Sequence, residues 1–204
     1  MISNNSSGLA ALRQLVVDYD VISFDFFDTL FIRPIYDPED AFDIMAHRFG
    51  IANFRELRRV AQTEAFQRMH EAGRKEITLQ NIYDVLPDCS VPTETLRDSE
   101  YDLELELVSP NPELINLFIE LIEAGKTVIV VSDMYLGKTF FADALRKFNL
   151  PEVPLFVSAD ENATKRDFGE LYDVVATALT VDKRQILHIG DNLVSDVEQA
   201  KAKG

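Results

Sequence analysis

Apolar residues along the chain occur in two kinds of pattern. Short continuous runs, rich in β-branched and aromatic residues and bounded by polar residues, are typical of buried strands. Four such runs occur, at residues 21–24, 127–131, 155–157 and 186–189, and each is followed by Ser, Asp or Gly. Elsewhere apolar residues recur every three or four positions, a spacing that predicts amphipathic helices.

The order of these elements predicts a fold class. From Pro112 onward helices and strands alternate, which is typical of crossover connections between parallel strands. Between the first and second strands, by contrast, there are only helical stretches, of which residues 52–72 form the longest. We therefore predict an α/β fold, a Rossmann-like parallel sheet flanked by helices, with an all-helical insertion after the first core strand. The expected core comprises residues 1–34 and 110–204, and the insertion residues 35–109.

Composition narrows the classes of function. The 204 residues are 47% apolar, enough for a proper core, and their net charge of −15 argues against nucleic acid as a partner. A small phosphorylated substrate stays compatible with this charge, because a bound divalent cation reverses the local field. The one cysteine, Cys89, fits a reducing compartment. With no signal-peptide pattern and no apolar run near the ~18 residues of a membrane span, we expect a soluble cytoplasmic protein without membrane insertion.

Polar side chains follow several of the predicted strands. Asp25 follows the first, and Asp191 and Asp196 follow the last. Because the carboxyl ends of parallel strands meet at one edge, we expect these carboxylates to form a cluster that suits Mg²⁺, with substrate phosphate completing the coordination. A carboxylate there can also be a nucleophile that forms an aspartyl-phosphate. Ser132 and Lys165 supply a hydroxyl and a cation for the phosphoryl oxygens.

These segments, in this order, resemble the four motifs of the haloacid dehalogenase-like (HAD) hydrolase superfamily. The first motif is matched by residues 25–30 (DFFDTL), the second by residues 131–133 (VSD), the third by Lys165 and the fourth by residues 190–196 (GDNLVSD). The resemblance covers nearly the whole chain. It implies that the helical insertion is the cap that shields the active site and selects substrates.

The resemblance also implies roles for individual residues. Asp25 is the expected nucleophile and, with the backbone carbonyl of Phe27, Asp191 and Asp196, a metal ligand. Catalysis is expected of Asp25, Ser132, Lys165 and Asp28, and substrate binding of Thr29, Ser132, Asp133, Lys165 and Arg166. Together these roles predict a Mg²⁺-dependent phosphatase that hydrolyses a small phosphomonoester through an aspartyl-phosphate on Asp25. A sugar phosphate is a candidate for that substrate.

One position departs from the pattern of the superfamily's phosphatases. They carry a second Asp two positions after the nucleophile, as general acid, whereas this chain has Phe27. Asp28 could replace it only if a local turn aims its side chain inward, because neighbours on an extended segment point to opposite sides. Four outcomes stay open: a phosphatase with Asp28 or water as acid, a hydrolase of activated phosphates, a phosphate-binding module without turnover, or a metal-independent dehalogenase, since dehalogenases also lack this Asp.

A narrower resemblance is carried by residues 23–30, 131–136 and 169–172, which are similar to a bacterial subgroup of predicted hydrolases with an FDxFDTL first motif. Members are often associated with surface-polysaccharide glycosyltransferases. This implies fusion to, or association with, a glycosyltransferase. The sequence also stops soon after the fourth motif, at Lys203-Gly204, so we expect it to be a fragment of a longer protein. In that setting the alternative function is an inactive phosphate-binding module of a larger biosynthesis protein.

Some positions can be interpreted in two ways. Lys165 and Arg166 are adjacent, and either could enter the site, although we prefer Lys165. Arg33 is interpreted as a surface residue, with contact to a substrate anion at the hinge as the alternative. We interpret His188 as an ordinary strand residue. The acidic residues of the last cap helix are interpreted as a solvated face: Glu100, Glu104 and Glu106.

Overall fold

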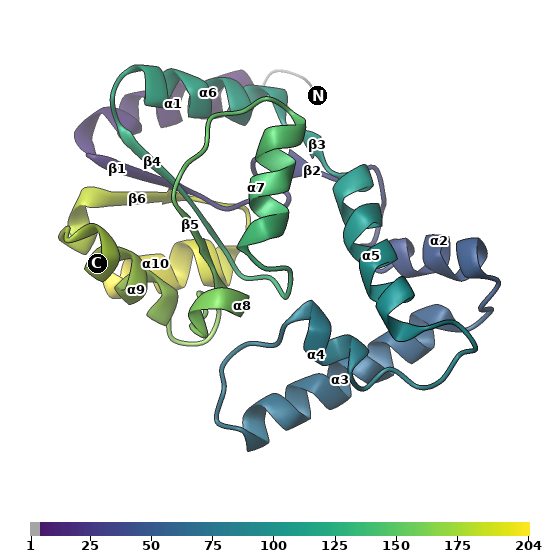
Figure 1. The fold of residues 1–204 in the computed structure, drawn as a ribbon. Coiled ribbons are helices and arrows are strands. Elements are labelled where there is room, and N and C mark those ends of the chain that lie inside the picture. Colours follow the sequence, from purple (N-terminus) through teal and green to yellow (C-terminus); the bar gives the residue numbers. More distant parts are fainter. Residues whose placement is uncertain (1–4) are drawn as a thin grey trace.

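The computed structural model describes residues 5–204 and contains a parallel sheet of four strands in the order β5-β4-β1-β6 (Figure 1). In register, Phe24 of β1 lies between Val130 of β4 and Ile189 of β6. The predicted α/β fold with a parallel sheet is confirmed. The strands are β1 (Val21–Phe24), β4 (Thr127–Ser132), β5 (Leu155–Val157) and β6 (Ile186–Ile189).

Helices cover both faces of this sheet (Figure 1). Side chains alternate along each strand, so Ile22 and Phe24 pack in a core with α6 and α7, while Val21 packs on the other face in a cluster with α9. This burial on both faces explains the continuous apolar runs in the sequence. The core helices are α1 (Asn5–Leu15), α6 (Pro112–Glu123), α7 (Lys138–Lys147), α8 (Ser158–Glu161), α9 (Glu170–Leu179) and α10 (Gln199–Lys203).

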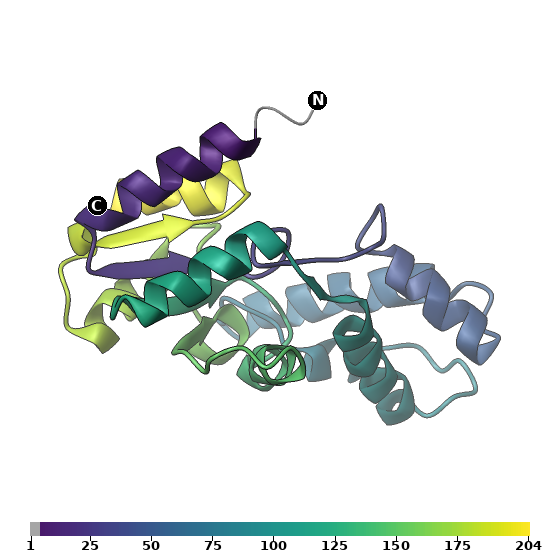
Figure 2. The same cartoon turned by 90° about the horizontal axis from the view of Figure 1, so that it is seen from above.

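The cap is a second layer of helices that extends to one side of the sheet (Figures 1 and 2). Two chain segments join it to the core as an antiparallel ribbon of β2 (Phe31–Ile32) and β3 (Ser109–Pro110). The cap helices are α2 (Asp40–Phe49), α3 (Phe54–Glu71), α4 (Leu79–Tyr83) and α5 (Thr93–Leu107).

Local signals in the sequence mark the ends of the cap helices. Gly50 and Gly73 follow α2 and α3 with φ of +67° and +66°, a left-handed conformation that a side chain disfavours. Thr78 caps α4, because its hydroxyl accepts a hydrogen bond from the backbone N–H of Asn81.

Among residues 5–204, no helix is both long and apolar enough to cross a membrane.

The acidic side of α5 corrects one interpretation from the sequence. Glu100 and Glu104 are buried, whereas only Glu106 is exposed. Glu100 forms a bidentate ion pair with Arg58 of α3, at 2.7 and 2.8 Å, with both side chains fully buried. The hydroxyl of Tyr83 donates to the same carboxylate at 2.6 Å. The expected solvated face was therefore wrong for two of its three residues, because distant residues supply buried partners.

Candidate active site

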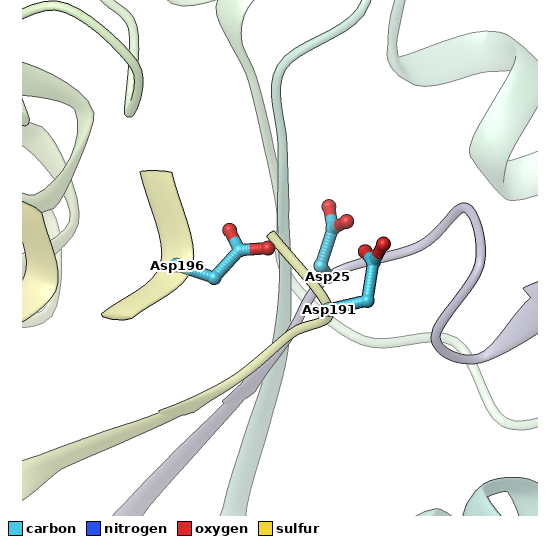
Figure 3. A group of neighbouring side chains, drawn as sticks. All are labelled: Asp25, Asp191 and Asp196. Carbon is cyan, nitrogen blue, oxygen red and sulfur yellow. The ribbon is translucent and has the colours of Figure 1, made fainter. Parts of the chain in front are cut away.

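Three carboxylates meet at the carboxyl edge of the sheet (Figure 3). Asp25 follows β1, Asp191 follows β6, and Asp196 extends toward them from a π-helical turn (Leu193–Glu198). One oxygen atom from each of the three lies within 4.8 Å of the others. The residues that the sequence proposed as a cluster are thus neighbours in space.

The loop before Asp196 brings its carboxylate close to the backbone. A Cβ atom at Gly190 would lie 2.4 Å from the carboxyl carbon of Asp196, so only glycine leaves the necessary room. The backbone N–H of Asn192 donates to Asp196 at 3.0 Å, and the Asn192 side chain caps the following turn. Gly190 therefore permits a position of Asp196 that any side chain at residue 190 would obstruct.

Lys165 lies between two of the carboxylates. Its Nζ atom is 2.9 Å from Asp25 and 2.6 Å from Asp196, and its side chain is only 2% exposed. Burial by itself lowers the pKa of Lys165, but the attraction of Asp25 and Asp196 outweighs burial and raises it, so the amine is charged. The side chain of Asp133 accepts hydrogen bonds from the backbone N–H groups of Lys165 and Arg166, at 2.8 and 3.0 Å.

The two adjacent basic residues, Lys165 and Arg166, have different partners. Lys165 enters the carboxylate cluster, whereas the guanidinium of Arg166 pairs with Glu76 of the cap at 2.6 Å. Asp133, which we expected to bind substrate, holds the backbone of both basic residues. Asp133 also lines the cavity between the core and the cap. Its observed contacts are those of a positioning residue.

His188, which we expected to be an ordinary strand residue, is a neighbour of the carboxylate cluster. Its Nδ1 lies 2.7 Å from the hydroxyl of Ser23, and its Nε2 lies 3.1 Å from Asp196. Burial lowers the pKa of His188, so we assign a neutral ring that accepts from Ser23 and donates to Asp196. The sequence did contain a signal for this contact, because Ser23 and His188 are the polar residues of two otherwise apolar strands, and they are paired in register.

The environments of the carboxylates differ. Burial by itself raises the pKa of Asp196, but the hydrogen bond from His188 and the charge of Lys165 bring it below its usual range. The pKa of Asp191 is raised, first by partial burial and then by repulsion from Asp25. Lys165 contacts the other two carboxylates, so the charge of Asp191 is the least compensated. A hard divalent cation fits this set of oxygen ligands.

The other residues proposed from the first two motifs occupy different positions. Ser132 is buried at the end of β4 and lines the cavity. Thr29 is buried, and within residues 5–204 its hydroxyl has no hydrogen-bond partner. Asp28 does lie in a local turn, with φ of +56°, but its side chain is 58% exposed and its carboxylate lies 4.0 Å from Arg33. The turn thus presents Asp28 largely to solvent.

A cavity of about 310 Å³ lies between Asp25 of the carboxylate cluster and residues of the hinge and the cap. Phe27 contributes an apolar wall, with its ring stacked at 5.9 Å from the ring of Phe140. The core residues that line the cavity are Asp25, Phe27, Ser132, Asp133, Met134 and Tyr135. The residues from the hinge and the cap are Arg33, Pro38, Glu39, Phe42, Gln62 and Glu104.

The cap is also tied to the core away from the β2–β3 ribbon. Glu76, which precedes α4 and is buried, accepts hydrogen bonds from Ser158 at 2.9 Å and from Arg166 at 2.6 Å. The backbone N–H of Leu79 donates to the carbonyl of Tyr135 at 2.8 Å. These contacts hold the cap over the cavity, and nothing in the sequence around Glu76 indicated its role.

Comparisons with known proteins add evidence on the fold. No protein-family model and no curated protein matches the sequence. Among solved structures, the L-2-haloacid dehalogenase PA0810 has a TM-score of 0.65 and 16% identity, covering 91% of this chain and 82% of its own. The HAD-hydrolase YfnB from Bacillus subtilis, bound to magnesium, has a TM-score of 0.59 and 19% identity, with coverages of 91% and 86%.

A HAD phosphatase from Thermococcus onnurineus is similar to the same extent, with a TM-score of 0.57, 18% identity and coverages of 91% and 83%. The structural neighbours therefore include both phosphatases and dehalogenases, at identities that carry information about fold alone. The expectation drawn from the four motifs is confirmed at this level. The chain has the fold of the haloacid dehalogenase-like hydrolases.

Proposed function

We propose that the protein is a Mg²⁺-dependent phosphatase that hydrolyses a small phosphomonoester through an aspartyl-phosphate on Asp25. The observation that carries this proposal is the grouping of three carboxylate oxygens within 4.8 Å beside a cavity that also contains Ser132. A metal-free site would have little use for Asp191, whose charge is repelled by Asp25. The hydrolase fold of the structural neighbours supports the same class of reaction.

Each residue has a defined task in this reaction. Bound Mg²⁺, held by Asp25, Asp191, Asp196 and the carbonyl of Phe27, would act as a Lewis acid on the phosphoryl group. One oxygen of Asp25 is held by Lys165, which leaves the other to attack phosphorus in line. The bond from phosphorus to the leaving oxygen then breaks. Water subsequently hydrolyses the acyl phosphate and regenerates Asp25.

Within residues 5–204, no residue near Asp25 is clearly placed to donate a proton to the leaving oxygen. Phe27 cannot donate a proton, and the largely exposed Asp28 faces Arg33. General acid catalysis is typically worth ~10²–10⁴-fold in rate, so its absence favours leaving groups that depart without protonation. We therefore expect aryl and acyl phosphates to be hydrolysed faster than phosphates of ordinary alcohols.

The experiment that tests the proposal compares hydrolysis of p-nitrophenyl phosphate and acetyl phosphate with and without Mg²⁺. Wild type should need the metal, and Asp25→Asn should lose turnover because its amide is a poor nucleophile. Asp98→Asn is a matched control on α5, since Asp98 is 66% exposed. A folded wild-type protein that binds phosphate without turning over either ester would instead be a binding module.

A second candidate is a metal-independent haloacid dehalogenase, favoured by Phe27 and by the dehalogenases among the structural neighbours. Its substrate carries a carboxylate that needs a cationic partner. Arg33, the basic residue that lines the cavity, is already paired with Glu104, which weighs against this candidate. Release of chloride from 2-chloropropionate without Mg²⁺ would establish the dehalogenase in place of the phosphatase.

A further inference from the structure

The wall of the cavity has an unusual balance of charge for a site that binds phosphate. Of the twelve residues that line it, four are acidic: Asp25, Glu39, Glu104 and Asp133. Arg33 is the one basic residue among these twelve. The positive charges of Mg²⁺ and Lys165 would be fully matched by the negative charges of the phosphoryl group, Asp25, Asp191 and Asp196. The part of the cavity beyond them, where the leaving group must lie, is therefore not a site for a second anion.

Arg33 and Glu104 form a fixed pair in this outer part. An Nη atom of Arg33 donates to Glu104 at 3.2 Å, and the two side chains are 8% and 2% exposed. The guanidinium also lies 4.6 Å from the centre of the Phe27 ring, which limits its movement. A carboxylate brought to Arg33 would meet Glu104 as well, and such like-charge contacts are strongly unfavourable.

The remaining lining groups suit hydroxyls and carbon–hydrogen surfaces. The oxygen of the Gln62 amide accepts from Arg58 at 2.9 Å, which leaves the amide nitrogen as a donor. Phe27, Phe42 and Met134 add apolar surface. Donors, a carboxylate acceptor and flat apolar faces together complement a sugar ring, which has hydroxyls at its edge and carbon–hydrogen groups on its faces.

We propose that the cavity selects a neutral, polyhydroxylated leaving group and that Glu104 is the residue that rejects acidic ones. This inference rests on the proposed phosphatase function. Phe27 narrows the class further, because without a general acid an anomeric oxygen departs more readily than an ordinary sugar alkoxide. The substrate class is a sugar 1-phosphate, in which the bond from phosphorus to the anomeric oxygen breaks and water supplies the proton.

The test uses matched substrate pairs that differ in one carboxylate: glucose, galactose and mannose 1-phosphates against the corresponding uronic acid 1-phosphates. We expect wild type to favour the neutral member of at least one pair by roughly tenfold or more in kcat/KM. Glu104→Gln should reduce this preference about tenfold and raise kcat/KM for the uronic acid, because Arg33 loses its partner. Glu106→Gln is the matched control, since Glu106 lies on the same helix but is exposed and pairs with Arg48.

A second variant should act in the same direction. Burial raises the pKa of Glu104 and the charge of Arg33 opposes that shift, so Arg33→Gln favours the neutral acid and discrimination against the uronic acid should fall. This result is informative even if Glu104→Gln does not fold. A wild-type preference for the uronic acids, or equal losses for both members of a pair in Glu104→Gln, would overturn the proposal. If the protein hydrolyses p-nitrophenyl phosphate but no neutral sugar 1-phosphate, the proposed substrate class is wrong and the phosphatase function stands. If it hydrolyses neither p-nitrophenyl phosphate nor any sugar 1-phosphate, the phosphatase function itself is wrong.

Discussion

Replacing Gly190 by Ala tests how closely the backbone at residue 190 approaches the side chain of Asp196. The new Cβ would lie 2.4 Å from the carboxyl carbon of Asp196, whereas carbon atoms in contact are normally ~3.5–4.0 Å apart. Either Asp196 or the backbone must therefore move by roughly 1 Å or more. Overpacking of this kind typically costs about 1–3 kcal/mol of stability.

The movement would also break contacts that Asp196 makes. The carboxylate of Asp196 is 2.6 Å from Lys165, 3.1 Å from His188 and 3.0 Å from the backbone nitrogen of Asn192. A hydrogen bond to a charged group contributes about 1.5–3 kcal/mol, so loss of even one adds to the packing cost. We expect Gly190→Ala to lower the free energy of unfolding by about 2.5–6 kcal/mol.

The assay combines urea unfolding with calorimetric titration of Mg²⁺, with Gly8→Ala as control. A Cβ atom at Gly8, in α1, would have no other atom of residues 5–204 within 4 Å, so alanine there should stabilise by about 0.5–1 kcal/mol. Gly190→Ala should instead lose both stability and Mg²⁺ affinity. A Gly190→Ala protein with wild-type stability and Mg²⁺ binding would refute the close approach on which this reasoning depends.

Three further changes test other parts of the structure. Arg58→Met should lower the free energy of unfolding, measured by urea melts, by about 3–5 kcal/mol, because Glu100 would be buried without its partner. Adding Glu100→Met to this variant should recover most of the lost stability. Glu76→Gln should raise KM more than it lowers kcat, since the tie to Arg166 holds the cap closed; an unchanged KM in steady-state kinetics would contradict that role. Asp28→Asn should keep most of the p-nitrophenyl phosphatase activity, because the side chain is 58% exposed, and a loss of about 10²-fold or more would instead identify Asp28 as the general acid.

The sequence by itself predicted the fold class, because its signals are local. A strand buried on both faces needs a continuous apolar run, and a helix needs a three- to four-residue spacing, whatever the rest of the chain does. The placement of Asp25, Ser132 and Asp191 at one edge follows from the same logic, since Ser132 ends a strand of the parallel sheet and the two aspartates come just after strands. Their roles in catalysis remain predictions.

Only the tertiary structure decided which polar residues are partners. Lys165 reaches Asp25 across 140 positions of sequence, Glu104 reaches Arg33 across 71 and Glu100 reaches Arg58 across 42. An acidic residue on a helix looks the same in sequence whether water or a buried guanidinium solvates it. The choice depends on packing between separate elements, because a charge can be buried only where another part of the chain supplies its partner.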